Sequence, residues 1–186
     1  MKYEYTLIRS KRRTLSLQLK GDELIVRAPK RVSKREIDDF VQRHEEWIEK
    51  HRSKIAQREA ELSAVPKLSE AEMSDLARKA LEYIPARVEY YAANMGLSYG
   101  RITLRCQKTR WGSCSAKKNL NFNILLMLTP PEVIDSVVVH ELCHLKEMNH
   151  SDRFYKLVYA AYPDYDRWNK WLKQNGAAIM ARVDRG

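Results

Sequence analysis

The sequence has only three cysteines, no long apolar run, no internal repeat and no low-complexity segment. Cys106, Cys114 and Cys143 are odd in number and none has a C-x-x-C partner, so no disulfide framework is expected. The longest apolar stretches, 124–128 and 137–139, are too short to span a bilayer. The first five residues carry charges where a signal peptide has its apolar region. We therefore expect a cytoplasmic protein with no membrane partner.

Positive charge exceeds negative charge, with a net charge of +10 and a sequence pI near 9.5. The sharpest local excess lies in residues 101–118, which contain six cations and no acid: Arg101, Arg105, Lys108, Arg110, Lys117 and Lys118. Such a segment favours association with a polyanion, such as nucleic acid or a phosphorylated small molecule. The alternative is a solvated basic loop, because net charge governs solubility and steering more than the choice of a partner.

The first third of the chain is typical of short strands followed by a helix. Residues 3–28 contain three short alternating runs, and Gly21-Asp22 marks a turn between the last two, which predicts a small antiparallel β unit. Ser33 and Glu36 have the spacing of a capping box, and apolar residues then recur at helical spacing as far as Ile55. Residues 1–62 are therefore expected to form a β-hairpin or strand unit and one long helix.

A linker at residues 64–68 separates this region from residues 69–186, the second expected domain. Ser69 and Glu72 form another capping box, and Gly96 is a plausible helix stop. Pro85 interrupts the pattern between them, so either a kink or two abutting helices is expected there.

The remaining segments alternate between β and helical patterns. Residues 101–106 and 119–127 are typical of strands joined by the basic loop. Thr129 is a capping residue for a helix that runs from Pro130 to Leu145. Further signals are a left-handed stop at Asn149, a helix cap at Ser151, and a last helix that ends at Gly176.

One short segment carries the clearest chemical signal. His140 and His144 are four residues apart, so they lie on one face of the predicted helix and two imidazoles can face a single metal ion. Glu141 projects beside them. This H-E-x-x-H arrangement is typical of zinc hydrolases in which the glutamate is the general base toward water. The other interpretation is a pair of buried, hydrogen-bonded histidines.

A catalytic zinc ion needs a third protein ligand. His150 lies six residues after His144, beyond the expected helix end, where a chain reversal can return it to the same metal. A capping or surface role for His150 is the alternative. Zn²⁺ is the expected cofactor on the basis of its nitrogen ligands.

Three motifs stand out in this region: Arg110-Trp111-Gly112-Ser113-Cys114, then residues 119–123, and then His140 to His150. Together they resemble the motifs of the YgjP-like metallopeptidase family. The resemblance is strong from about residue 104 to 172 and looser before that. It implies an α+β fold: a minimal zincin-like metallopeptidase domain, related to SprT-like and Wss-type proteases, with a small antiparallel sheet and an N-terminal β-plus-helix extension.

The same resemblance implies roles for the chemical residues. His140, His144 and His150 would hold the zinc ion, and Glu141 would be the catalytic acid and base. Metzincins carry a glycine three residues after the second histidine, whereas this chain has Glu147. The turn toward His150 is therefore expected later, at Asn149.

Four further residues are candidate substrate contacts. The strand at 120–126, which includes Asn121, is expected to be a substrate-facing edge strand, with an ordinary paired strand as the alternative. Arg110 is expected to bind a carboxylate or phosphate, and Trp111 either lines the cleft or packs in the core. Tyr155 either donates a hydrogen bond to an oxyanion or forms part of a helix rim.

These patterns predict a zinc-dependent metallopeptidase that acts on a peptide or protein substrate. The alternative is a metal-dependent phosphohydrolase of the pyrophosphatase type, in which Arg105, Lys108 and Arg110 would neutralise nucleotide phosphates. A nucleic-acid adaptor with a structural zinc ion is a third interpretation. It is weakened because such a site needs four protein ligands and no fourth is evident near His150.

Overall fold

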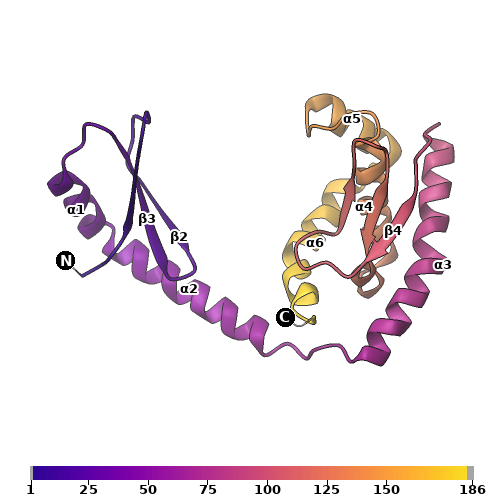
Figure 1. Cartoon of the computed structure of the whole chain (residues 1–186), viewed down its shortest axis with the longest axis horizontal. Coiled ribbons are helices and arrows are strands. Elements are labelled where there is room, and N and C mark those ends of the chain that lie inside the picture. Colours follow the sequence, from indigo (N-terminus) through magenta and orange to yellow (C-terminus); the bar gives the residue numbers. More distant parts are fainter. Residues whose placement is uncertain (1, 184–186) are drawn as a thin grey trace. The chain divides into compact units, whose positions relative to one another are not determined.

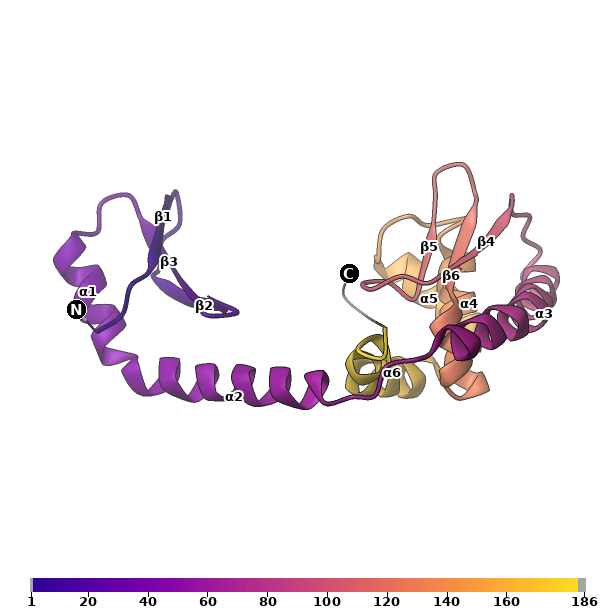
Figure 2. The same ribbon diagram turned by 60° about the horizontal axis from the view of Figure 1, so that its bottom comes forward.

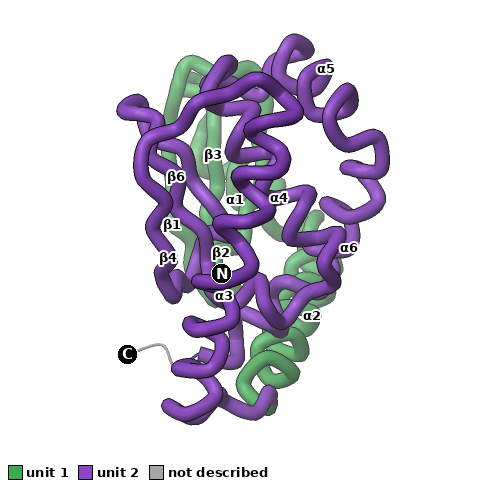
Figure 3. Tube along the Cα trace, turned by 90° about the vertical axis from the view of Figure 1, so that its right-hand side faces the viewer, with its two compact units in different colours: residues 1–64 green, residues 65–186 purple. Residues whose placement is uncertain are grey.

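The computed structural model describes residues 2–183 and divides the chain into two compact units. Unit 1 comprises Met1–Ala64 and unit 2 comprises Val65–Gly186 (Figure 3). Both units combine helices with a small three-stranded sheet, so the expected α+β class is confirmed. In the described part of the chain, no helix combines the length and apolar character that a membrane crossing requires.

Unit 1 packs a three-stranded sheet against two helices. Its elements are β1 (Thr6–Ser10), β2 (Ser16–Lys20), β3 (Glu23–Pro29), α1 (Lys34–Arg43) and α2 (Glu45–Ser63). The strand order is β1-β3-β2, with β2 antiparallel and β1 parallel to β3. The prediction of an antiparallel unit is therefore wrong for β1. After β1 the chain crosses to the opposite edge of the sheet, where it forms β2. It then turns at Gly21 and returns as the central strand β3.

The helical segment of unit 1 is two helices rather than the predicted long one. The Ser33–Glu36 capping box is present at the start of α1. The break falls at His44, whose backbone leaves the helical region and whose Nδ1 lies 2.8 Å from the Phe40 carbonyl oxygen. The apolar spacing continues across this single-residue break, because Ile37, Val41 and Ile48 all reach the same core.

Unit 2 surrounds one central helix, α4. Its elements are α3 (Glu70–Asn94), β4 (Ile102–Arg105), β5 (Gly112–Cys114), β6 (Leu120–Asn123), the 3₁₀ helix η1 (Ile124–Leu128), α4 (Pro131–Cys143), α5 (Asp152–Ala161) and α6 (Tyr165–Met180). Nine of the thirteen residues of α4 are buried, so this helix is apolar on almost every side. It packs on α3, α5 and α6 (Figure 1), and also on β5.

The second sheet is also mixed, and β6 is its central strand. The order is β4-β6-β5, with β4 parallel and β5 antiparallel to β6 (Figure 2). The interpretation of residues 120–126 as an edge strand is therefore wrong, because both edges of β6 are paired and residues 124–128 turn into η1. The edge strand beside α4 is β5, which lies inside the segment expected to be only a basic loop.

Helix α3 begins at the predicted capping box and runs through Pro85 without dividing into two helices. Its end has the hydrogen bonds of a glycine stop. Gly96 has φ of +61°, and the Leu97 amide donates to the Ala92 carbonyl at 2.8 Å.

Four other helix signals are corrected. Thr129 does not cap α4, because its hydroxyl donates to the Leu126 carbonyl and Pro130 occupies the cap position. Helix α4 itself ends at Cys143, two residues before the predicted Leu145. Asn149 is not left-handed, since Lys118 is the one non-glycine residue with positive φ among those described. Gly176 lies within α6, where an added Cβ would meet the Trp111 ring at 3.0 Å. The small residue there allows the close packing of Trp111.

Candidate active site

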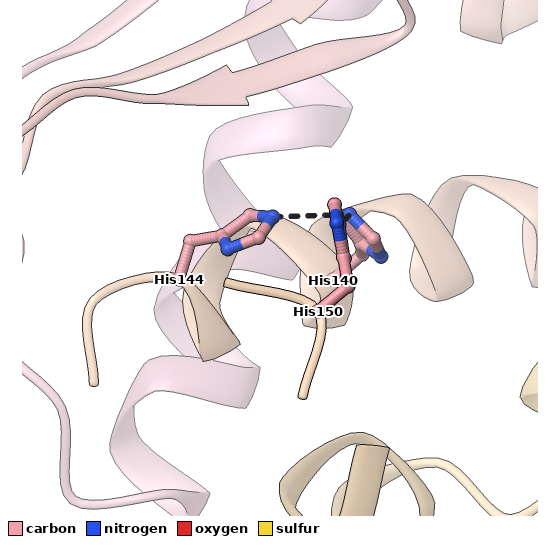
Figure 4. A group of neighbouring side chains, drawn as sticks. All are labelled: His140, His144 and His150. Carbon is pink, nitrogen blue, oxygen red and sulfur yellow. Dashed lines mark hydrogen bonds between the residues drawn. The ribbon is translucent and has the colours of Figure 1, made fainter. Parts of the chain in front are cut away.

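Three histidines converge at the carboxyl end of α4. His140 is in its last turn, His144 follows the helix directly, and His150 lies in the loop that leads to α5 (Figure 4). The Nε2 atom of His140 lies 3.2 Å from that of His144 and 3.1 Å from that of His150. One ligand atom from each residue falls within 4.8 Å of the others. The chain reversal between His144 and His150 therefore brings the three imidazoles together.

Phe154 forms the floor of this cluster. It is fully buried in α5, and its ring centroid lies 4.9, 4.6 and 4.9 Å from those of His140, His144 and His150. The predicted cap at Ser151 accepts a hydrogen bond from the Phe154 amide and so fixes the first turn of α5. This packing holds three rings that come from different segments against one rigid surface.

Hydrogen bonds on the far side of two rings orient their Nε2 atoms. His144 Nδ1 lies 3.0 Å from the Glu147 carbonyl oxygen, which only accepts, so this Nδ1 carries the proton and Nε2 keeps its lone pair. His140 Nδ1 lies 2.8 Å from the Tyr165 hydroxyl of α6. Glu147, which replaces the glycine of the metzincin pattern, thus contributes its backbone carbonyl to the site.

Burial keeps the imidazoles of His140 and His144 in the neutral form. Burial lowers the pKa of His140 to about 4, and the nearby His144 and His150 add to this effect. Burial also lowers the pKa of His144. Neutral imidazole is the form that binds a metal. Lone pairs about 3 Å apart repel one another unless a proton or cation lies between them, so the donor set fits one divalent metal ion.

Glu141 lies beside the cluster in a confined position. It is 6% exposed, and burial raises the pKa of its carboxyl group to about 8. Gly112 of β5 borders it so closely that an added Cβ would lie 2.7 Å from both Cγ and Oε1 of Glu141. Glycine at this position is therefore required by the close approach of β5 to the carboxylate.

A cavity of about 250 Å³ opens next to His140 and Glu141. Its walls come from α4, α6 and the segment that enters β5; the lining residues are Thr109, Arg110, Trp111, Gly112, Ser136, Val137, His140, Glu141, Tyr165, Asn169 and Leu172. Of the four predicted substrate contacts, Arg110 and Trp111 line this cavity. Trp111 also packs on Gly176, so it both lines the cavity and contributes to the core.

The other two predicted contacts lie elsewhere. Asn121 is on the central strand β6 and donates a hydrogen bond to the Ser113 hydroxyl at 3.2 Å. Tyr155 is half-buried on α5, with its ring 6.3 Å from that of His150. Neither lines the cavity, and their proposed roles toward substrate stay predictions.

The structure divides the basic segment 101–118 between the two ends of the second sheet. Arg101 and Lys118 lie at one end, where the Gly100 amide donates to the Lys118 carbonyl. Arg105 and Arg110 lie toward the other end, and Arg110 borders the cavity. The six cations therefore do not form one continuous patch.

Sequence reasoning missed three residues that support the site: Tyr165, Phe154 and Asn123. Asn123 is 1% exposed, and its side-chain nitrogen donates to the carbonyls of Gln107 and Arg110 at 2.7 and 2.9 Å. It therefore fixes the segment that carries one wall of the cavity. Asn123 lies in a motif already noted in the sequence, but no local pattern there indicates hydrogen bonds to residues 107 and 110.

Three imidazoles that converge beside a buried glutamate, at the mouth of a cavity, are the arrangement of a metal-dependent hydrolase. Comparison with protein families makes the class specific. The family model described as YgjP-like, metallopeptidase domain, matches residues 13–74 and 63–175. The chain belongs to this family of metallopeptidases, as the motifs indicated, and nothing found favours the phosphohydrolase alternative.

Two solved structures of metallopeptidase zymogens are similar to parts of the chain. Abylysin from Pyrococcus abyssi is 18% identical, with a TM-score of 0.44, and the match covers 49% of this chain and 93% of that one. Jannalysin from Methanocaldococcus jannaschii is 21% identical, with a TM-score of 0.46, and the match covers 50% and 97% of the respective chains. No curated protein matches the chain.

Proposed function

We propose that this metallopeptidase is a zinc enzyme that hydrolyses peptide bonds, with His140, His144 and His150 as the metal ligands and Glu141 as the catalytic acid and base. The observation that carries the proposal is the convergence of three imidazole nitrogens within 4.8 Å of one another, next to the buried Glu141. Three protein ligands leave a coordination position open, which distinguishes catalytic from structural zinc sites.

Zinc is favoured over other divalent metals because all three donors are imidazole nitrogens and none is a carboxylate or carbonyl oxygen. When bound, zinc supplies a Lewis acid that lowers the pKa of water to about 7 and polarises a carbonyl group. A cation near Glu141 also favours the ionised form of its carboxyl group, which burial alone opposes.

Glu141 moves the proton in this proposal. Its Oε1 accepts a proton from the attacking water and then returns it to the nitrogen of the leaving amine. The burial of the side chain and its contact with β5 hold the carboxylate in one position, so little reorganisation precedes the transfer.

The geometry also suggests where a peptide lies. Strand β5 has β6 on one side only, and the strand order leaves its other edge without a partner among residues 2–183. A peptide that adds to this edge gains main-chain hydrogen bonds and passes Glu141. One of its side chains then enters the cavity, where Arg110 provides a charge for an acidic residue. Trp111, Asn121 and Tyr155 remain secondary candidates for contact with the substrate.

The decisive test separates metal binding from proton transfer. Glu141→Gln should lower turnover of an unfolded protein substrate by about 10²- to 10⁴-fold while the zinc content stays at wild-type stoichiometry. His150→Ala should lower the zinc content itself, measured by elemental analysis. Full activity in Glu141→Gln, or unchanged zinc in His150→Ala, would falsify the assigned roles.

Two broader assignments belong to the same proposal. We assign residues 69–186 to the catalytic domain and residues 1–62 to a separate N-terminal domain. We also place the protein in the cytoplasm, because Cys106, Cys114 and Cys143 are free thiols and Cys106 is exposed. Fractionation of cells that express the tagged chain tests this location.

A further inference from the structure

The parallel pairing in unit 1 gathers two basic segments that are about twenty residues apart in the sequence. Ser10 at the end of β1 pairs with Pro29 at the end of β3, and Ser16 at the start of β2 pairs with Arg27. The loop after β1 and the loop after β3 therefore leave the same end of the sheet. They lie at the upper end of the sheet in Figures 1 and 2.

This end of the sheet carries a dense group of cations, which we call the basic edge: Arg9, Lys11, Arg12, Arg13, Lys30 and Arg31. No acidic residue occurs in 5–21 or in 24–35. The first acid after it, Glu36, is engaged by the backbone amide and hydroxyl of Ser33 in the capping box. The edge therefore gathers its six cations at one end of a sheet, whereas those of segment 101–118 are divided between two ends.

Arg9 organises the edge. Its Nη1 donates to the carbonyls of Pro29, Lys30 and Val32 at 3.1, 3.1 and 2.7 Å, so it fixes the second loop beside the first. Within residues 2–183, no carboxylate lies within ion-pair distance of any cation of the edge. The Nε of Arg12 is shielded from solvent and has no hydrogen-bond partner. Four cations of the edge, Lys11, Arg13, Lys30 and Arg31, are exposed on the two neighbouring loops and are available to an external anion.

We propose that the basic edge binds the phosphate backbone of duplex nucleic acid without sequence preference. Four of its six cations are arginines, whose guanidinium groups match phosphate geometry. The edge contains no aromatic side chain on which an unpaired base would stack, and such stacking is a main contribution to single-strand binding. The proposal rests on unit 1 alone and does not depend on the catalytic assignment.

The chemistry of the edge distinguishes nucleic acid from a membrane. Insertion into the membrane interface relies on apolar side chains that enter the acyl region. The large apolar side chains that are exposed in the described part of the chain are Leu81, Tyr90, Met148 and Tyr159, and all belong to unit 2. The basic edge instead offers charges flanked by the polar residues Ser10 and Thr14.

The test compares two full-length variants that lose the same charge. One replaces Lys11, Arg13, Lys30 and Arg31 by Gln. The matched control replaces Arg43, Lys50, Lys54 and Arg58 by Gln; these four cations are also exposed in unit 1, but they lie on the helices among acidic residues. Binding to a short fluorescein-labelled DNA duplex of mixed sequence is measured by anisotropy from about 50 to about 200 mM salt.

The basic-edge variant should lose at least about tenfold in affinity. Its plot of log K against log salt should also become less steep, with the magnitude of the slope lower by about 3 to 4, near 0.9 for each lost phosphate contact. The control should keep both values near those of the wild type. Circular dichroism confirms that each variant is folded. The proposal would be overturned by equal losses in both variants or by undiminished binding of the basic-edge variant. It would also be overturned if the wild-type protein bound single strands, polyglutamate or anionic vesicles more tightly than it binds the duplex.

Discussion

Replacement of Gly112 by alanine tests whether β5 sets the position of the carboxylate of Glu141, the proposed catalytic residue. The added Cβ would lie 2.7 Å from Cγ and Oε1 of Glu141 and 2.9 Å from Cδ, whereas ordinary contact begins at 3.4 Å. Either the buried Glu141 side chain or strand β5 must therefore move by about 0.7 Å. The strand is paired with β6 and packed on α4, so we expect the carboxylate to move.

A displacement of about 1 Å at a catalytic group costs up to about 10²-fold in rate. Gly112→Ala should therefore lower kcat by roughly 10- to 100-fold, which corresponds to about 1.4 to 2.7 kcal/mol in the activation free energy. The zinc content should not change, because the three atoms nearest to the added methyl group all belong to Glu141.

The assay measures turnover of a labelled unfolded protein together with metal content and the thermal unfolding midpoint. Ser113→Ala on the same strand is the control, since Ser113 accepts a hydrogen bond from Asn121 and is not among the cavity lining. Wild-type turnover in Gly112→Ala would show that the carboxylate has room to move without loss. A parallel loss of zinc would show that the strand supports the metal site rather than the glutamate alone.

Three further substitutions test the supports of the site. Tyr165→Phe removes the hydroxyl 2.8 Å from His140 Nδ1 and should weaken zinc affinity about 10-fold, measured by chelator competition; unchanged affinity would contradict its orienting role. Phe154→Ala should destabilise the protein by about 3 to 5 kcal/mol in denaturant unfolding, because the ring is fully buried beneath the three imidazoles. Asn123→Ala leaves the carbonyls of residues 107 and 110 without their donor, so it should lower the free energy of unfolding by about 1 to 3 kcal/mol and raise KM. A change in kcat alone would refute the role of Asn123 in shaping the cavity.

The sequence predicts those parts of the structure that depend on local spacing. The capping boxes at Ser33 and Ser69 and the cap at Ser151 are present, because a capping side chain contacts an amide only two or three residues away. The convergence of His140 and His144 follows from helix periodicity in the same way.

Features that depend on long-range packing could not be predicted in this way. The contact between His140 and Tyr165 joins two helices 25 residues apart, and the pattern around Tyr165 is that of an ordinary helix face. The parallel pairing of β1 with β3 arises because the chain crosses the sheet between β1 and β2. The alternation of apolar and polar residues within each strand does not indicate such a crossing. Gly176 lies inside α6 and not at its end, and a glycine required by close packing looks identical in sequence to one required by a turn.

The position of α6 has a consequence for the synthesis of the protein. All three histidines and Glu141 precede residue 151, but Tyr165, Asn169 and Leu172, which complete the cavity and orient His140, come from α6. A ribosome-bound chain that has emerged only as far as α5 therefore contains all three histidines and Glu141 but lacks one wall of the cavity. The cavity beside the histidines is therefore completed only after α6 has been synthesised and has packed on α4.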